Sequence, residues 1–354
     1  MWGLWVHEAI TGDEIDQVWP TENSSWSMNL AGAGECSFAF RIDDPETGMK
    51  LQDVERLFAG ADRHLCLRWG PAAVGAWKVE DWDYDQDTET VTVTGAELRV
   101  EAKWRMTYGM ANYGDGTLVV SGRSASGAVR AILQRFQYWD SRWVYPIDLP
   151  ADGPGALSFT WDYWKKFTID DLLQQVEQLG YEIVFRPYIT AAGKLRYQVL
   201  VAAAVSVGMK YFHLQAADSP LSGVGYRRSY SEQITGGQGL GSGTGQDQQT
   251  AFVSTGSPLR VIRDAKRTFP DLEGAVLQSA TTAWGIAAGV PITQWRVKTF
   301  TASDEHPASL AAVASAWSLD SSGHRIFPDG RHHVRVISCN GTMSTQITVE
   351  VQGA

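Results

Sequence analysis

The chain has 354 residues, a formal net charge of −10 and a hydrophobic content of 44%. This length allows two or three domains with buried cores, and the composition is ordinary for a globular protein. Proteins that grip nucleic acid need a basic patch, and the chain has no basic run, so tight DNA or RNA binding is disfavoured. No apolar run reaches the roughly 18 residues of a membrane span, and the N-terminus lacks the regions of a signal peptide, so we expect a protein located inside a cell.

The cysteine pattern indicates neither a disulfide framework nor a metal site. The three cysteines, Cys36, Cys66 and Cys339, are widely spaced and form no Cys-x-x-Cys pair. A zinc site would need closer ligand spacing. We therefore expect three free, buried thiols.

Residues 1–106 have the pattern of short β-strands. Apolar residues alternate with polar ones in several runs, and turn residues separate the runs. The runs are Trp2–Val6, Trp26–Leu30, Cys36–Ile42, Leu65–Trp69, Trp77–Val79 and Val91–Val93. The segment 96–106 is ambiguous and could form a short helix. Many short strands at this spacing predict a first β-domain, a closed barrel or a sandwich.

Residues 107–205 contain the clearest helical signals. A helix is predicted over Ser126–Phe136, after a short strand at Leu118–Val120. In a second helix the apolar residues repeat every three or four positions, at Ile169, Leu172, Leu173, Val176 and Leu179. Thr168 and Asp171 read as a capping box, and Gly180 stands where a left-handed residue ends a helix.

Two alternating strands, over 181–185 and 195–201, follow this helix and are joined by a turn at Gly193. The helix is shorter than the roughly 12–15 residues at which isolated helices persist, so its apolar side must pack on the hairpin. We expect residues 107–205 to form an α/β domain inserted between two β-domains.

Residues 206–354 return to a β pattern. Strands are predicted at Tyr211–Leu214, Val224–Ile234, Ile292–Thr301, Val334–Ile337 and Ile347–Val351. A helix is predicted over Asp271–Ala288, and Ser309–Ser318 is expected to be helix or loop. The sequence GGQGLGSGTGQDQQ, over 236–249, predicts a flexible loop. We expect a second β-barrel domain with a C-terminal helix and strands.

The glycine-rich segment is a candidate contact site rather than a phosphate loop. It lacks the Gly-Lys-Ser/Thr ending of a P-loop and has no Gly-x-Gly-x-x-Gly spacing. A long exposed loop can bind a partner protein. The candidate partner-contact residues are Gly236, Gly237, Gly239, Gly241 and Gly243.

An acidic run alternates with other residues at Asp81, Asp83, Asp85 and Asp87. It resembles the start of a calcium loop, but Gln86 stands where that loop needs glycine and the closing Glu is missing. We interpret the run as one solvated face at a strand or hairpin end. If this face lined a channel, it would repel DNA phosphates.

Aromatic residues are dense over 138–164, and Trp139, Trp143, Trp161 and Trp164 are the candidate interface aromatics. Such a cluster can form a carbohydrate-binding platform, but clustered Trp and Tyr are more often core or protein–protein interface. We favour core plus interface.

No arrangement of residues predicts catalysis. The chain has no Gly-x-Ser-x-Gly elbow, and His324, His332 and His333 surround a turn without the nearby carboxylate or cysteine support that metal sites use. A carboxylate pair for glycoside hydrolysis has no short signature, so that alternative stays open. We expect no cofactor, no metal and no enzymatic activity.

Three segments carry a resemblance to a known family. They are Trp77-Lys-Val-Glu-Asp81 with Thr90–Gly95 and a helix through Arg105, the helix and helix–hairpin over 126–201, and Gly225–Gly239. Over about residues 75–255 this combination resembles the minor tail proteins of long-tailed actinobacterial phages, in the baseplate-hub (tail-associated) class. The segments are similar to the end of the first hub barrel, the inserted α/β domain, and the entry strand and glycine turn of the second barrel.

The resemblance implies a β-rich α+β fold in which two barrel domains, 1–106 and 206–354, are separated by the inserted domain 107–205. It implies a homotrimer whose six barrels form a pseudo-sixfold ring that continues the tail tube and lets DNA pass without specific binding. The implied neighbours are the distal tail protein, the tape-measure protein and other tail-tip proteins, in a virion tail tip assembled in the host cytoplasm. Two alternatives stay open: a carbohydrate- or receptor-binding tail-tip module, and a hydrolase acting on cell walls.

Overall fold

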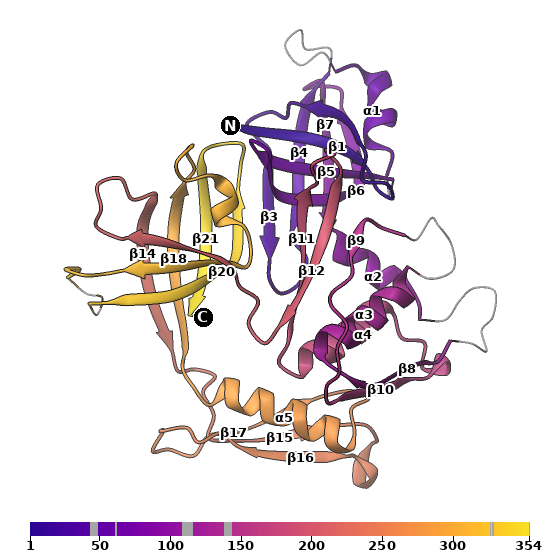
Figure 1. Ribbon diagram of the computed structural model, residues 1–354, viewed down its shortest axis with the longest axis vertical. Coiled ribbons are helices and arrows are strands. Elements are labelled where there is room, and N and C mark those ends of the chain that lie inside the picture. Colours follow the sequence, from indigo (N-terminus) through magenta and orange to yellow (C-terminus); the bar gives the residue numbers. More distant parts are fainter. Residues whose placement is uncertain are drawn as a thin grey trace.

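The computed structural model describes residues 1–42, 49–60, 62–107, 116–137, 144–325, 327 and 329–353. The fold is β-rich, with a large, mainly antiparallel sheet and three smaller sheets among these residues (Figure 1). In the described part of the chain no helix is both long and apolar enough to cross a membrane.

The N-terminal region forms seven described strands, six of them at the predicted runs, whereas its second strand and the helix between its fourth and fifth strands were not predicted. The strands are β1 (Trp2–Glu8), β2 (Glu14–Val18), β3 (Ser25–Asn29), β4 (Glu35–Arg41), β5 (Arg63–Trp69), β6 (Ala72–Asp85) and β7 (Thr90–Glu97). Helix α1 (Leu51–Phe58) lies between β4 and β5. In β4 the alternation buries Cys36, Phe38 and Phe40 on one side of the strand. The ambiguous segment after β7 forms a 3₁₀ turn and the short helix α2 (Glu101–Trp104).

The middle region confirms the predicted helices and hairpin. Its elements are β8 (Leu118–Arg123), α3 (Ala125–Phe136), β9 (Ile147–Asp148), β10 (Leu157–Trp161), α4 (Ile169–Gln178), β11 (Glu182–Ile189) and β12 (Leu195–Ala202). The capping box is present: the Asp171 backbone N–H donates to Thr168 Oγ1 at 3.2 Å, and the Thr168 N–H donates to Asp171 Oδ2 at 2.7 Å. Helix α4 packs against α3 and α2 as well as β11, so the hairpin supplies only part of its contact.

The C-terminal region adds strands and one long helix. They are β13 (Val207–His213), β14 (Leu221–Ser229), β15 (Gly236–Leu240), β16 (Thr250–Ser254), β17 (Asp264–Thr268), α5 (Gly274–Ala288), β18 (Ile292–Thr301), β19 (Ser315–Asp320), β20 (Arg331–Gly341) and β21 (Gln346–Gly353). The expectation of helix or loop over 309–318 is wrong in its second half, where β19 begins. Burial of Trp317 and Leu319 and pairing with β13 and β20 outweigh the weak strand propensity of the Ala- and Ser-rich sequence.

Strands from both ends of the chain join in one sheet. Among the described residues, thirteen strands follow the order β14-β18-β21-β20-β3-β4-β7-β6-β5-β1-β2, with β13 and β19 attached beside β20. The connection is the antiparallel pairing of β20 with β3, which sets Asn340 opposite Ser27. The order is an open path, so the pairings between described strands close no barrel. One apolar core also spans both regions, and it includes Phe38 and Trp77 as well as Phe300 and Trp317.

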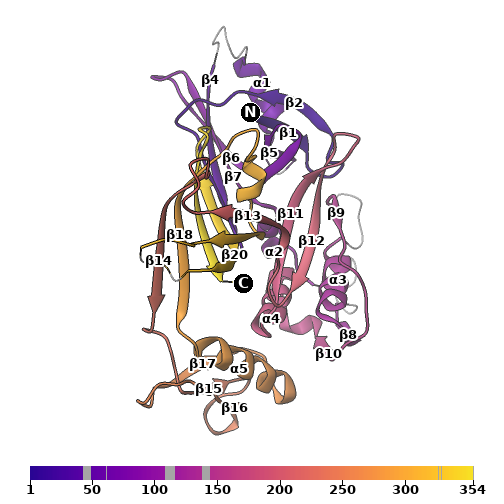
Figure 2. The ribbon, with the colours of Figure 1, turned by 60° about the vertical axis from the view of Figure 1, so that its left-hand side comes forward.

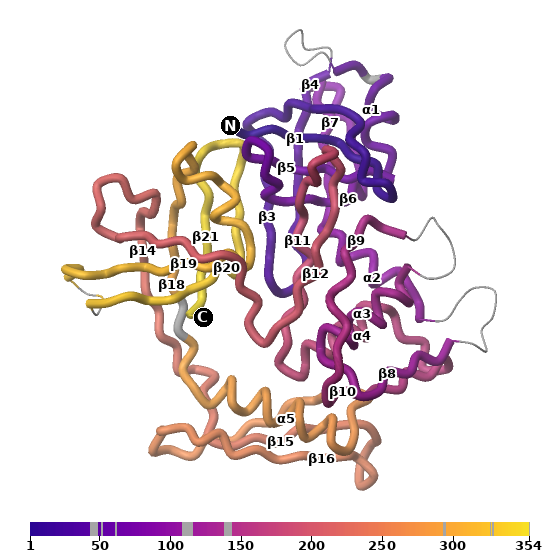
Figure 3. The backbone as a smooth tube through the Cα atoms, in the orientation of Figure 1, coloured from indigo at the N-terminus to yellow at the C-terminus, as the bar shows by residue number. Residues whose placement is uncertain are grey.

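A compact unit interrupts the C-terminal strands between β14 and β18, which pair with each other (Figure 3). Strands β16, β15 and β17 form its sheet, with β15 in the centre, and α5 packs on one face. The predicted flexible loop over 236–249 is therefore wrong for its first part, which is the central strand. The reason is packing, because a Cβ on Gly239 would lie 1.9 Å from Thr281 Oγ1 of α5. The glycines permit a close approach of helix and sheet.

Two buried charge contacts tie the middle region to the rest. Arg335 on β20 forms a two-pronged ion pair with Glu182 on β11. Arg99, after β7, donates to Glu177 and Asp170 of α4. Because both arginine side chains are about nine-tenths buried, with 7% and 11% exposure, these pairs fix the middle region against the large sheet. Figure 2 shows the two layers, with β14 and β18 on one side and α3 and α4 on the other.

Candidate assembly surfaces

The predicted acidic run lies at the far end of β6. Strand β5 pairs with β6 only as far as Lys78, and Glu80 is an extra residue in a bulge beside β7. Beyond the bulge, Asp81, Asp83 and Asp85 are all exposed on one side of the strand. Across the β6–β7 ladder they face threonines, in the order Thr94, Thr92 and Thr90. The predicted solvated acidic face is present at these positions.

The fourth acidic residue, Asp87, lies in the exposed turn between β6 and β7. Its backbone N–H donates to Asp85 Oδ1 at 2.9 Å, and the Thr88 hydroxyl donates to Asp85 Oδ2 at 3.0 Å. These hydrogen bonds lower the pKa of Asp85, the Asp87 bond most of all. The turn therefore keeps a negative charge at the tip of the hairpin.

We call the side of the large sheet that carries Asp81, Asp83 and Asp85 the outer face. The strand register continues it across the sheet through Thr94, Ser37, Ser25, Ser27, Asn340 and Thr348. A concavity of about 840 Å³ lies on this face where β3 meets β20, and Ser, Thr, Asn and Gln residues form much of its lining. Its only charged lining residues among the described ones are Glu35 and Glu80. Among the described residues, the lining of this concavity offers hydroxyl groups and carboxylates but no cation for a phosphate.

The opposite end of the outer face is basic. Arg296 lies opposite Glu350 of β21 in the register, and Gly225 of β14 lies opposite Arg296. Arg227 and Lys298 point to the same side by the alternation of β14 and β18, and both are exposed. Sequence reasoning missed these cations because Arg227 lies about seventy residues from Arg296 and Lys298 in the chain and meets them only through strand pairing. The positions of Arg296 and Lys298, two apart in one strand, were the only local signal.

Three of the glycine residues expected to contact a partner have a packing role inside the chain. Gly237, Gly239 and Gly241 face α5, where a Cβ would lie 2.5 Å or less from Trp284, Thr281 or the Leu272 backbone. Gly236 lies on the exposed side of the small sheet beside Asp264, and Gly243 adopts a positive φ of 90° in a turn. Three of the five positions thus lack space for a side chain because the helix or its leading segment packs against them, and contact of this segment with a partner stays a prediction.

The aromatic candidates divide between core and surface. Trp161 is buried, stacks on Phe159 with ring centroids 4.7 Å apart, and donates through Nε1 to Gln175 Oε1 at 2.8 Å. It is a core residue. Trp164 is 61% exposed and packs edge-on against Tyr163. Trp139 and Trp143 lie outside the described residues.

No metal or thiol chemistry is supported in the described part of the chain. Those residues contain no group of three His, Cys, Asp or Glu that could hold a metal ion. His324 stacks on Phe327, and His332 Nε2 lies 2.8 Å from Ser321 Oγ. The three cysteines are free and buried, as predicted. Burial raises the pKa of Cys66 to about 11 and raises those of Cys36 and Cys339 further, which keeps the thiols protonated and unreactive.

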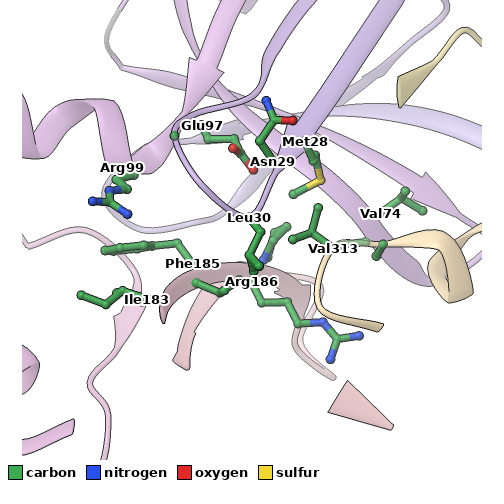
Figure 4. A pocket seen from close by; sticks show the side chains of 15 residues that line it. Met28, Asn29, Leu30, Val74, Glu97, Arg99, Ile183, Phe185, Arg186 and Val313 are labelled. Carbon is green, nitrogen blue, oxygen red and sulfur yellow. The ribbon is translucent and has the colours of Figure 1, made fainter. Parts of the chain in front are cut away.

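A small cavity of about 30 Å³ lies between β3, β7, β11 and Val313 (Figure 4). It has space for one or two water molecules but not for a larger ligand. Glu97 faces it and accepts a hydrogen bond from the Gly34 N–H at 2.5 Å. Burial raises the pKa of Glu97 to about 7. The cavity belongs to the seam between regions and is not a binding site.

No family model and no curated protein matches the sequence. Solved structures with a similar fold do exist. The 43 kDa tail protein of prophage MuSo2 from Shewanella oneidensis matches with a TM-score of 0.60 and 11% identity, covering 99% of this chain and 98% of that chain. The tail protein from Neisseria meningitidis MC58 matches with a TM-score of 0.56 and 11% identity, covering 99% and 96%. Prophage tail protein gp18 from Listeria monocytogenes EGD-e matches with a TM-score of 0.54 and 9% identity, covering 99% and 94%. The fold of this chain is that of solved phage tail proteins, along nearly its whole length.

Proposed function

We propose that this chain is a structural hub protein of a phage tail tip, in the class of actinobacterial phage minor tail proteins. The observation that carries the proposal is the fold, which is similar to prophage tail proteins over 99% of this chain and at least 94% of theirs. Three copies would form a ring that continues the tail tube. In each copy the β-rich regions 1–106 and 206–354 would supply two neighbouring sectors of the ring, and region 107–205 would brace them.

The outer face is the surface proposed to line the channel. Asp81, Asp83 and Asp85 would stand at one end of that lining, and the hydroxyl-lined concavity would occupy its centre. DNA binds to proteins chiefly through cations that neutralise its phosphates. Within the central concavity, a lining of hydroxyl groups and carboxylates without a cation among the described residues would let DNA pass without holding it.

The proposed hub has no enzymatic activity and binds its neighbours by surface contact. Its expected partners are the distal tail protein, the tape-measure protein and other tail-tip proteins. It would act in the virion after assembly in the host cytoplasm. Native mass spectrometry of the purified chain tests self-association, since the proposal expects a trimer. A chain that stays monomeric both at high concentration and with its tail-tip neighbours would contradict the proposal.

Trp164 favours a second candidate function, a carbohydrate- or receptor-binding module. Its 61% exposure beside Tyr163 is the arrangement that a sugar ring can stack on. If this function is correct, Trp164→Ala should abolish saturable binding to a host glycan array, while Trp104→Ala, which removes another exposed tryptophan, should leave it intact. The hub proposal predicts no such binding by the unaltered chain.

A further inference from the structure

We infer that two edges of the large sheet are the surfaces by which copies of this chain bind each other, with the acidic end of β6 in one copy lying beside β14 of the next. The inference rests on the proposed ring and names the contact that would close it. It commits to one occupant of each edge, a second copy of this chain.

Both segments are unpaired on one side. Strand β14 pairs only with β18 among the described residues and ends the strand order of the sheet. Of the described strands, only β7 pairs with the Asp81–Asp85 segment of β6, since β5 pairs with β6 only as far as Lys78. Unpaired edges expose backbone N–H and C=O groups that another strand can satisfy.

The two edges carry opposite charges on the same face. The β6 edge presents Asp81, Asp83 and Asp85, and in the part of the chain described none of them has an ion-pair partner. Arg41 on β4 is on the same face, but β7 lies between it and β6. The β14 edge presents Arg227, with Lys298 on the adjacent strand. Arg296 beside them is paired within the chain, with its Nε 3.7 Å from Glu350 Oε1. A strand pairing between these edges would set carboxylates beside cations.

The net charges of residues 1–106 and 206–354 differ in the same direction as the charges of the two edges. Residues 1–106 contain 20 Asp or Glu and only 9 Lys or Arg, whereas residues 206–354 contain 11 acidic and 12 basic residues. Contact between copies through two different patches is head-to-tail, and it closes into a ring when the rotation between copies permits. Contact of β14 with β14, or of β6 with β6, would oppose like charges and is disfavoured.

A third edge, β2, is a weaker candidate. Its carboxylates are already neutralised within the chain, since Glu14 pairs with Arg68 at 3.0 Å and Asp16 with Arg56 at 3.2 Å. With the described residues, Asp81, Asp83 and Asp85 of β6 form no such pair, so their charge is available to a partner. The structure therefore favours β6 as the acidic side of the contact.

Charge reversal tests the inference in the full-length chain. We expect Asp81→Lys with Asp83→Lys to lower the assembled fraction at least tenfold in sedimentation velocity, and Arg227→Glu with Lys298→Glu to do the same. The variant with all four substitutions should assemble again, because its edges are complementary with the signs exchanged. Glu22→Lys with Glu55→Lys is the matched control, since it makes the same charge change at exposed positions away from both edges and should leave assembly unchanged. Circular dichroism and thermal unfolding establish that each variant is folded.

A cross-link tests whether the two strands are adjacent. Each of Asp81→Cys, Asp83→Cys and Asp85→Cys is combined with Arg227→Cys, and at least one pair should form a disulfide between copies. The native cysteines do not compete, because all three are buried. If the chain assembles but neither double reversal weakens it and no pair cross-links, the edge contact is wrong and the ring proposal stands. If the unaltered chain never self-associates, alone or with tail-tip neighbours, the ring proposal itself fails.

Discussion

Two buried histidines lie where the N-terminal strands meet the middle region. His7 donates through Nδ1 to the Gly12 carbonyl at 2.9 Å, and Arg68 donates to its Nε2 at 2.5 Å. His64 Nδ1 lies 2.8 Å from the Tyr197 hydroxyl of β12. Burial lowers the pKa of His7 to about 4 and that of His64 to about 3, from 6.5 for an exposed histidine. Both side chains are therefore neutral in the folded protein at pH 7.

These pKa shifts make the free energy of unfolding depend on pH, and the two histidines and Glu97 act in opposite directions. Between about pH 4.5 and 6.5 the unfolded chain binds protons at both histidines and the folded chain does not, so each histidine makes stability rise with pH. Glu97 acts in the opposite direction, because its pKa is raised from 4.5 to about 7 and the folded carboxyl keeps a proton that the unfolded chain releases. The net effect in this window is that of one group, a rise of about 1.4 kcal/mol per pH unit.

Urea unfolding at several pH values checks this expectation. His64→Asn should leave His7 and Glu97 to cancel, so the free energy of unfolding should be nearly independent of pH between 4.5 and 6.5. Glu97→Gln should make the dependence steeper than in the unaltered chain. If His64→Asn has the same slope as the unaltered chain, His64 is not neutral and buried as the structure has it.

At the scale of elements, the unit formed by β15, β16, β17 and α5 depends on glycines at the helix–sheet contact. Gly239→Ala would force a methyl group into Thr281, and we expect a loss of about 1–3 kcal/mol of stability in this unit. Hydrogen exchange of residues 236–288 measures it. Adding Thr281→Ala removes the clashing hydroxyl and should restore part of the protection, whereas Gly353→Ala, a strand position with open space around it, should change nothing. Unaltered exchange in Gly239→Ala would mean that helix and sheet are farther apart.

Elements with local signals were predictable from the sequence. The capping box of α4, the apolar repeat of α3 and the alternation of β4 each depend on residues close together in the chain, and all three elements are present. The strand β15 was not predictable in this way. Glycine has low strand propensity, and only contact with α5, more than thirty residues later, explains its sequence.

Of the two charged candidate surfaces, only the acidic one was predictable, because only it depends on residues close together in the chain. The acidic face follows from alternation within one strand, so Asp81, Asp83 and Asp85 could be assigned to one side before the structure was known. The basic edge could not, because Arg227 and Lys298 come together only through the pairing of β14 with β18 around the inserted unit. The joining of β20 to β3 is likewise a long-range pairing that leaves no short sequence pattern.

At the scale of the whole molecule, the large sheet gives the chain one continuous outer face with a charge gradient along it. Carboxylates stand at one unpaired edge, hydroxyl groups line the central concavity, and cations stand at the other edge. A head-to-tail ring would place these edges in contact and leave the hydroxyl-lined surface to face the channel. The gradient has the same sign as the uneven distribution of charge between residues 1–106 and 206–354.

Electron microscopy of the assembled protein, at a resolution that resolves strands, tests the central proposal most directly. The proposal predicts a ring of three copies, with the β6 end of each copy beside β14 of the next and the outer face toward the channel. A monomer under all conditions, or a ring in which Asp81, Asp83 and Asp85 point away from the channel and from the neighbouring copy, would contradict it.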